Sequence, residues 1–168
     1  VMNMTDGVLT PKQSKEQLIR HTLVDLGLHE TLTYTLTSEA TVNEFNLFHS
    51  LDNTVKLMSP LGEERSAARK SLIGSLLQTI HYNNAHSNKD VNIFEIANTY
   101  SDKEVSNLAI AVSGDYVNVP WMGKKEAVDF YLVKGFVETL FKKLCIEESR
   151  YTFEKVEADN KDFHPGRS

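Results

Sequence analysis

The fold depends on the stretch Val91-Asn92-Ile93-Phe94-Glu95-Ile96-Ala97-Asn98-Thr99-Tyr100, which runs directly into Ser101-Asp102-Lys103-Glu104. The first run is rich in β-branched and aromatic residues and predicts a strand. Asn107 to Ser113 predicts its neighbour, and Ser101 to Glu104 predicts the turn between them. Because adjacent strands joined by a short turn favour antiparallel pairing, we expect these two segments to form the centre of an antiparallel sheet.

A helix is predicted near the beginning of the chain. Thr10 can cap it, Pro11 suits the first helical position, and Gln13 can return a hydrogen bond to the cap. We expect the helix to run to Leu26 and to end at Gly27, because glycine tolerates the left-handed conformation that ends helices. Its apolar stripe at helical spacing consists of Leu18, Ile19, Leu23 and Leu26.

The segment Thr31-Leu32-Thr33-Tyr34-Thr35-Leu36-Thr37 alternates strictly between threonine and apolar residues. This alternation predicts a strand with Leu32, Tyr34 and Leu36 on one face and the threonines on the other. A short capped helix is expected over 38–45, and a strand over 55–58.

The rest of the chain completes an alternation of helices and strands. A helix is predicted to start near Ser71, with a buried stripe of Leu72, Leu76, Leu77 and Ile80. A second is expected over about 127–144 and a strand over 151–156, with loops over 83–90 and 114–125. This order predicts an α+β fold, in which helices flank an antiparallel sheet.

Composition restricts the class of protein. The 168 residues are 40% hydrophobic and 24% charged, which is typical of a globular protein, and no apolar run approaches the ~20 residues that span a bilayer. The net charge of −5 argues against a general binder of polyanions. The single Cys145 excludes an internal disulfide, fits the reducing conditions of the cytoplasm, and is expected to be a small core residue.

Both ends of the chain are typical of an excised piece of a longer protein. Residues 1–9 are linker-like, and the chain stops within the turn-like segment Phe163-His164-Pro165-Gly166-Arg167-Ser168. We therefore expect a linker over 1–9 and one domain over 10–168.

No arrangement of reactive residues indicates a catalytic centre. The six histidines are scattered, at positions 21, 29, 49, 81, 86 and 164, and no glycine-rich phosphate loop is present. Glu63 to Arg65 with Arg69-Lys70 could form a phosphate clamp, but we favour an exposed charged segment. Trp121 could stack on a base, but a hydrophobic plug that pins its loop is favoured. We accordingly assign no catalytic, cofactor-binding or metal-binding residue.

Four stretches together resemble the β subunit of bacterial phenylalanine–tRNA ligase. The first is Gln17 to Arg20 with Gly27 to Leu36, similar to the first helix–strand unit of that family's core. The second, Ser59 to Glu64 with Arg69 to Leu77, resembles "NPLS-E…LR-SLLPGLL". The others are Asn92-Ile93-Phe94-Glu95-Ile96-Ala97-Asn98-Thr99-Tyr100, similar to "LFEIGNVF", and Asp129 to Glu138 with Phe163 to Ser168, similar to "DFFDLKGxVE…HPGRSA".

The resemblance implies a class II aminoacyl-tRNA synthetase-like core whose first helix–strand unit builds a subunit interface. It makes Leu18, Ile19, Thr22, Leu28, Leu32 and Tyr34 the candidate interface residues. In that class, the strand that resembles Phe94 to Tyr100 continues into an arginine that holds the α-phosphate of ATP. Ser101-Asp102-Lys103 stand there instead, which implies a non-catalytic copy.

The resemblance also implies partners. The partner of such a module is the α subunit, in an α2β2 heterotetramer; the holoenzyme binds tRNA, and the whole enzyme uses ATP and magnesium. Two other readings stay open. One is a free-standing class II enzyme with a site around Arg65, Arg69 and His164, and the other is a synthetase-like regulatory or binding paralogue.

Overall fold

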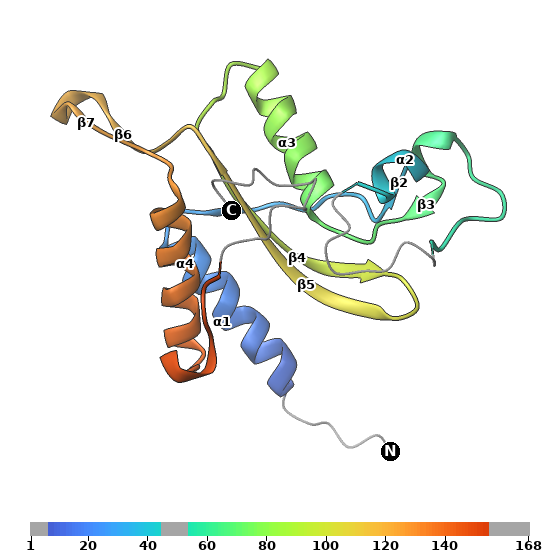
Figure 1. Ribbon diagram of the computed structural model, residues 1–168, viewed down its shortest axis with the longest axis horizontal. Coiled ribbons are helices and arrows are strands. Elements are labelled where there is room, and N and C mark those ends of the chain that lie inside the picture. Colours follow the sequence, from blue (N-terminus) through green and yellow to red (C-terminus); the bar gives the residue numbers. More distant parts are fainter. Residues whose placement is uncertain (1–6, 45–53, 155–168) are drawn as a thin grey trace.

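The computed structural model describes residues 7–44 and 54–154, and all structural statements below concern these residues (Figure 1). In chain order the regular elements are α1 (Pro11–Asp25), β1 (His29–Glu30), β2 (Leu36–Thr37), α2 (Glu39–Val42), the 3-10 helix η1 (Glu63–Arg65), β3 (Ala67–Ala68), α3 (Ile73–Ala85), β4 (Val91–Tyr100), β5 (Glu104–Ser113), β6 (Asp115–Val119), the 3-10 helix η2 (Pro120–Met122), β7 (Lys124–Ala127), α4 (Phe130–Lys143) and the 3-10 helix η3 (Glu148–Arg150). The α+β expectation is confirmed.

The long hairpin of β4 and β5 is the centre of the fold, as the sequence predicts. The two strands pair antiparallel without interruption, from Val91 opposite Ser113 to Tyr100 opposite Glu104. β5 begins three residues earlier than expected, because the turn needs only the residues between Tyr100 and Glu104. At this end the Asn98 side-chain amide donates to the Glu104 carboxylate, 2.5 Å away.

Helices cover both faces of this hairpin. On one face α1 and α4 lie side by side, and Leu23, Leu28, Phe94 and Phe136 form a buried cluster between them and the sheet (Figure 1). On the other face α3 packs through Leu76 against Val91 and Ile93. Because successive side chains of a strand point to opposite faces, β4 contributes to both layers and is buried on both sides.

α1 begins and ends as predicted. The Thr10 hydroxyl accepts from the Gln13 N–H and the Gln13 side chain accepts from the Thr10 N–H, which completes the capping box. Leu26 is the C-cap, and Gly27 follows with a φ of +82°. Leu23 is fully buried, but Leu18 of the predicted stripe is 38% exposed.

The continuous strand expected over 31–37 is wrong. The residues between β1 and β2 belong to no strand. β2 pairs antiparallel with β3. β1 pairs parallel with β4, so the central sheet is not entirely antiparallel as expected. The reason is that Thr33 bonds to the side chains of Arg69 and Glu95 instead of to a neighbouring strand. The strand expected over 55–58 is also wrong, since it is reduced to one bridge between Lys56 and Ala67.

Smaller corrections concern the second half of the chain. The loop expected over 114–125 contains the hairpin of β6 and β7. α3 continues to Ala85, into the loop expected from 83 onward, and Leu77 of its predicted stripe is 42% exposed. Residues 151–154 form no strand, and the last two positions of the strand expected over 151–156 lie outside the described residues.

Candidate functional site

A buried ion pair lies between β4 and the segment that joins β1 to β2. Arg69 and Glu95 have side chains that are 4% and 1% exposed, and Arg69 Nη1 lies 2.9 Å from Glu95 Oε1. Arg69 Nη1 also donates to the Thr33 hydroxyl (2.7 Å), and Arg69 Nε donates to the Asn98 carbonyl (3.2 Å). The second Glu95 oxygen accepts from the Thr33 hydroxyl at 2.7 Å. Such surrounding hydrogen bonds are what a charge pair needs in order to remain charged away from water.

The exposed charged segment expected over Glu63 to Lys70 is therefore only half correct. Glu63 to Arg65 form η1 and are exposed, whereas Arg69 and Lys70 are buried. The physical reason is β3, whose buried alanines at 67 and 68 carry the chain into the interior before these two cations. Because Arg69 donates to protein acceptors, it is not available to clamp a phosphate.

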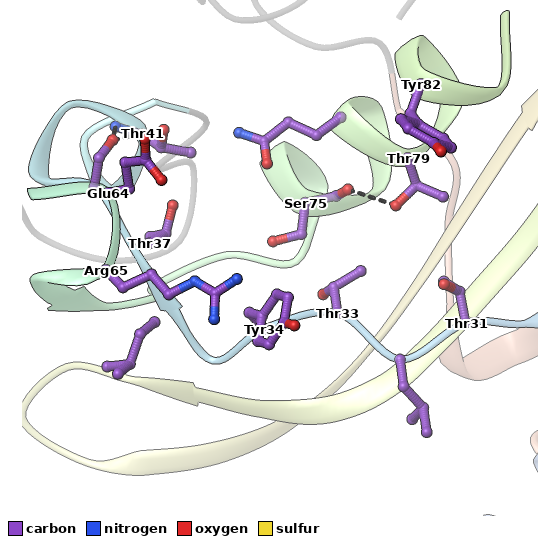
Figure 2. A pocket seen from close by; sticks show the side chains of 14 residues that line it. Thr31, Thr33, Tyr34, Thr37, Thr41, Glu64, Arg65, Ser75, Thr79 and Tyr82 are labelled. Carbon is purple, nitrogen blue, oxygen red and sulfur yellow. Dashed lines mark hydrogen bonds between the residues drawn. The ribbon is translucent and has the colours of Figure 1, made fainter. Parts of the chain in front are cut away.

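A groove of about 860 Å³ opens beside this pair (Figure 2). The segment between β1 and β2 forms one wall with Thr31, Thr33 and Tyr34, and α3 forms the opposite wall with Ser75 and Thr79. The whole lining consists of Thr31, Leu32, Thr33, Tyr34, Leu36, Thr37, Ser38, Thr41, Glu64, Arg65, Ser75, Gln78, Thr79 and Tyr82. Most of these residues offer neutral hydroxyl groups.

The charges of the groove are few. Glu64 and Arg65 are the charged members of the described lining, and they oppose one another in sign. The Arg65 guanidinium also sits over the Tyr34 ring, 3.6 Å from its centroid, which is within the range of a cation–π contact. The groove can hydrogen-bond a polar group, but its described lining has no surplus of positive charge with which to stabilise a nucleotide triphosphate.

The six candidate interface residues divide into two groups. Leu32 is 84% exposed, Tyr34 68% and Leu18 38%, while Ile19 packs partly against the core. Thr22 and Leu28 are buried inside this chain, at 5% and 1% exposure, so their side chains are not available to a partner.

The two buried positions are explained by their contacts. The Thr22 hydroxyl donates to the Leu18 carbonyl (2.8 Å), and Leu28 belongs to the core cluster between α1, α4 and β4. The structure thus removes Thr22 and Leu28 from the candidate interface. The role of the exposed members remains a prediction.

Other residues singled out in the sequence lie apart from the groove. Cys145 is exposed just after α4, with a φ of +58°, so its expected place in the core is wrong. Trp121 is 84% exposed and does not plug its loop. Within residues 7–44 and 54–154, no three or more His, Cys, Asp or Glu side chains gather as metal ligands, and no helix is long and apolar enough to cross a membrane. His164 lies outside the described residues.

Comparisons with known proteins agree with this architecture. Solved class II synthetase structures superpose on most of the chain: a pyrrolysyl-tRNA synthetase from Desulfitobacterium hafniense has a TM-score of 0.60 at 16% identity, covering 82% of this chain and 46% of that one. A histidine–tRNA ligase subunit from Alicyclobacillus acidocaldarius has a TM-score of 0.54 at 13% identity, and the match covers 82% of this chain and 40% of the ligase subunit. At such identities the likeness shows the fold alone.

Sequence relatives are closer. Phenylalanine–tRNA ligase β subunits from Staphylococcus aureus strains Mu50 and N315 are 36% identical over 98% of this chain, which spans only 21% of their length. The family model described as the phenylalanyl-tRNA synthetase beta chain CLM domain matches residues 1–168. A match over the whole chain, on a class II synthetase-like fold, leads to one conclusion: the chain belongs to the family of phenylalanyl-tRNA synthetase β chain CLM domains.

Proposed function

We propose that this chain is a non-catalytic module of the β subunit of a phenylalanine–tRNA ligase, where it binds the α subunit. In this proposal the whole enzyme is a cytoplasmic α2β2 heterotetramer that attaches phenylalanine to its tRNA. ATP and magnesium are used at a site on α, and the holoenzyme binds the tRNA. Residues 10–168 form the module, and 1–9 link it to the preceding part of the polypeptide. Family membership and the 36% identical β subunits support this proposal.

The proposal that the module is non-catalytic rests on where the positively charged residues around β4 lie. Arg69 is buried and bonded to Glu95, and the turn after Tyr100 offers Ser101, Asp102 and Lys103. Adenylate formation develops negative charge on phosphorus and needs a rigid cation placed beforehand at that point. A lysine on an exposed turn is a poor substitute for a guanidinium that binds with two parallel hydrogen bonds.

The subunit-binding part rests on Leu32 and Tyr34. These two residues alternate with Thr31 and Thr33, whose backbone or side chain is anchored on β4, and their own side chains are largely exposed. Tyrosine is among the residues that most often dominate the binding energy of protein interfaces, and an exposed leucine beside it adds apolar area. Hydrogen bonds from Thr31 and Thr33 to β4 hold the backbone of this segment, so little conformational entropy is lost when a partner covers it.

The test is assembly of the α subunit with full-length β carrying Leu32→Glu or Tyr34→Glu, followed by sedimentation velocity. Each variant is expected to weaken assembly at least about tenfold, the loss of a modest interface anchor. Val24→Glu is the matched control, since Val24 is 53% exposed on α1 and outside the candidate set. Unchanged assembly of both variants would refute this interface, and failure of unaltered β to bind α would favour a stand-alone binding paralogue.

A further inference from the structure

The hairpin of β6 and β7 projects from the body beyond the start of α4 (Figure 1). Its tip is the 3-10 turn Pro120–Met122, in which Trp121 is 84% exposed and Met122 60% exposed. Tryptophan is usually highly buried, so a bare tryptophan at the end of a projecting element is unusual for a surface that meets only water. The part of the chain that the structure describes gives this side chain little to pack against.

The base of the hairpin is fixed by a carboxylate from another part of the chain. Asp90 Oδ1 accepts from the Asp115 N–H (2.9 Å), and Asp90 Oδ2 accepts from the Asn118 amide (3.1 Å). Gly114, with a φ of +81°, makes the connection from β5, and a side chain there would collide with the Lys89 carbonyl and the Asp90 carboxylate. The direction of the hairpin is therefore determined at its base.

Tyr116 provides a second, independent anchor. Its hydroxyl donates to the Leu26 carbonyl at the end of α1 (2.7 Å). Its ring meets the Phe136 ring edge-on, with centroids 5.5 Å apart, and so connects the hairpin to α4 and to the core. With its base held by Asp90, Leu26 and Phe136, the hairpin presents its tip in a defined position.

The charges of the hairpin decide the class of partner. Lys125 Nζ lies 2.9 Å from Asp115 Oδ2, and Lys124 Nζ lies 3.2 Å from Glu126 Oε1. Both cations thus have an acid beside them, and a phosphate backbone would find little uncompensated positive charge. Tryptophan and methionine, by contrast, are enriched where proteins bind other proteins.

We propose that the Trp121–Met122 tip inserts into an apolar pocket on another domain of the same polypeptide. The inference rests on the proposed function, in which this module is part of a longer β subunit. The chain spans only 21% of its relatives' length, so most of that polypeptide lies outside it. A domain tethered to the module has a high effective concentration and can occupy the tip permanently.

The position of the tip favours this occupant over the α subunit. Tyr34 contacts Arg65, which lies next to β3. The β2–β3 pair and the β6–β7 hairpin lie at opposite ends of the long dimension of the molecule (Figure 1). A partner that covers Tyr34 reaches Trp121 only if its contact extends along the long dimension of the molecule. The hairpin supplies a second surface, distinct from the one assigned to α.

Photo-cross-linking in the assembled ligase tests the proposal. A benzophenone amino acid replaces Met122 in full-length β co-expressed with α, and mass spectrometry identifies the adduct. The expected product has the mass of one β subunit and joins position 122 to a β peptide outside residues 1–168. An adduct with α, with tRNA or with a second β, or no adduct at all, overturns it. The same probe at Lys103, on the exposed turn between β4 and β5, is the control.

A substitution gives an independent readout. Trp121→Glu in full-length β is expected to speed amide hydrogen exchange in residues 115–127 at least about tenfold, because a central interface anchor is lost. Lys124→Gln, which removes a neighbouring charge, should leave exchange unchanged. Equal exchange rates in Trp121→Glu and unaltered β would contradict the proposal. Sedimentation of the same samples with α tests the proposed function separately. If the proposed function is correct, Trp121→Glu still assembles with α; if unaltered β does not assemble with α, the proposed function itself fails.

Discussion

Arg69 connects three segments that are far apart in sequence. Its side chain bonds to Glu95 and to the Asn98 carbonyl on β4, and to the Thr33 hydroxyl. Its backbone N–H donates to the Thr35 carbonyl, and its carbonyl accepts from the Tyr100 N–H. Arg69 is therefore one of the residues that place the segment exposing Leu32 and Tyr34, together with Glu95, to which Thr33 also bonds.

We predict that Arg69→Ala lowers the free energy of unfolding by about 3–5 kcal/mol, because Glu95 is left charged and buried without its partner. The double variant Arg69→Met with Glu95→Leu should lose clearly less, since both charges are then absent. Urea denaturation monitored by circular dichroism measures both. A loss below about 1 kcal/mol for the single variant, the range of a solvent-exposed pair, would show that the pair is not buried in solution.

The sequence identifies one member of this ion pair but not the other. Glu95 stands between Phe94 and Ile96 in the predicted central strand, and a carboxylate buried there requires a partner. Nothing local identifies the partner, because Arg69 lies 26 residues earlier in a charged stretch that resembles a surface segment. Only the pairing of β2 with β3, a tertiary event, brings the two together.

At the scale of elements, the hairpin of β6 and β7 depends on Asp90. The N–H of Asp115, and secondarily the amide of Asn118, hold the pKa of the Asp90 carboxyl below its ordinary value. A lowered pKa means that the contribution of this carboxylate is complete above the ordinary aspartate value and is lost as the pH falls through the lowered one. The Asp115 carboxylate raises the pKa of Lys125, so on the alkaline side the contribution of this contact is complete below the ordinary lysine value and is lost as the pH rises through the raised one.

We predict that Asp90→Ala loosens the hairpin and reduces its sensitivity to acid. Amide exchange of residues 115–119 should be faster than in the unaltered protein at neutral pH and nearly equal to it once Asp90 is protonated. Asp90→Asn, which keeps an acceptor for one of the two bonds, should lie between them. Asp25→Asn, on the exposed end of α1, is the control. An identical acid response in Asp90→Ala would show that another group controls the hairpin.

Element types were predicted best where the signal is local. The capping box of α1 and the β4–β5 hairpin were predictable because the residues that specify them are adjacent in sequence. The β6–β7 hairpin was not, because Pro120 and Gly123 indicate a loop, while the strands beside them are short and depend on Asp90. Over 31–37 the alternation predicts a strand, but it does not show that the side chains of Arg69 and Glu95 take the place of a neighbouring strand.

At the scale of the whole molecule, the two proposals assign two surfaces on different elements to partners. One is the exposed face of Leu32 and Tyr34, which the proposal assigns to α, and the other is the Trp121–Met122 tip. Between them the body is an α+β core with helices on both faces of β4 and β5 (Figure 1). A module that contacts partners at two ends and holds its buried arginine in an internal pair is suited to organising an assembly. In the proposed function, the α subunit supplies the chemistry.

The most direct test of this account is the number of adenylate sites in the assembled enzyme. Calorimetric titration of the reconstituted ligase with a non-hydrolysable phenylalanyl-adenylate analogue should give one site for each pair of α and β. Lys103→Ala and Arg65→Ala in β should leave both the number of sites and the affinity unchanged, because neither residue is placed to hold a phosphate. A second site for each pair, lost when either residue is replaced, would contradict the claim that this module has no active site of its own.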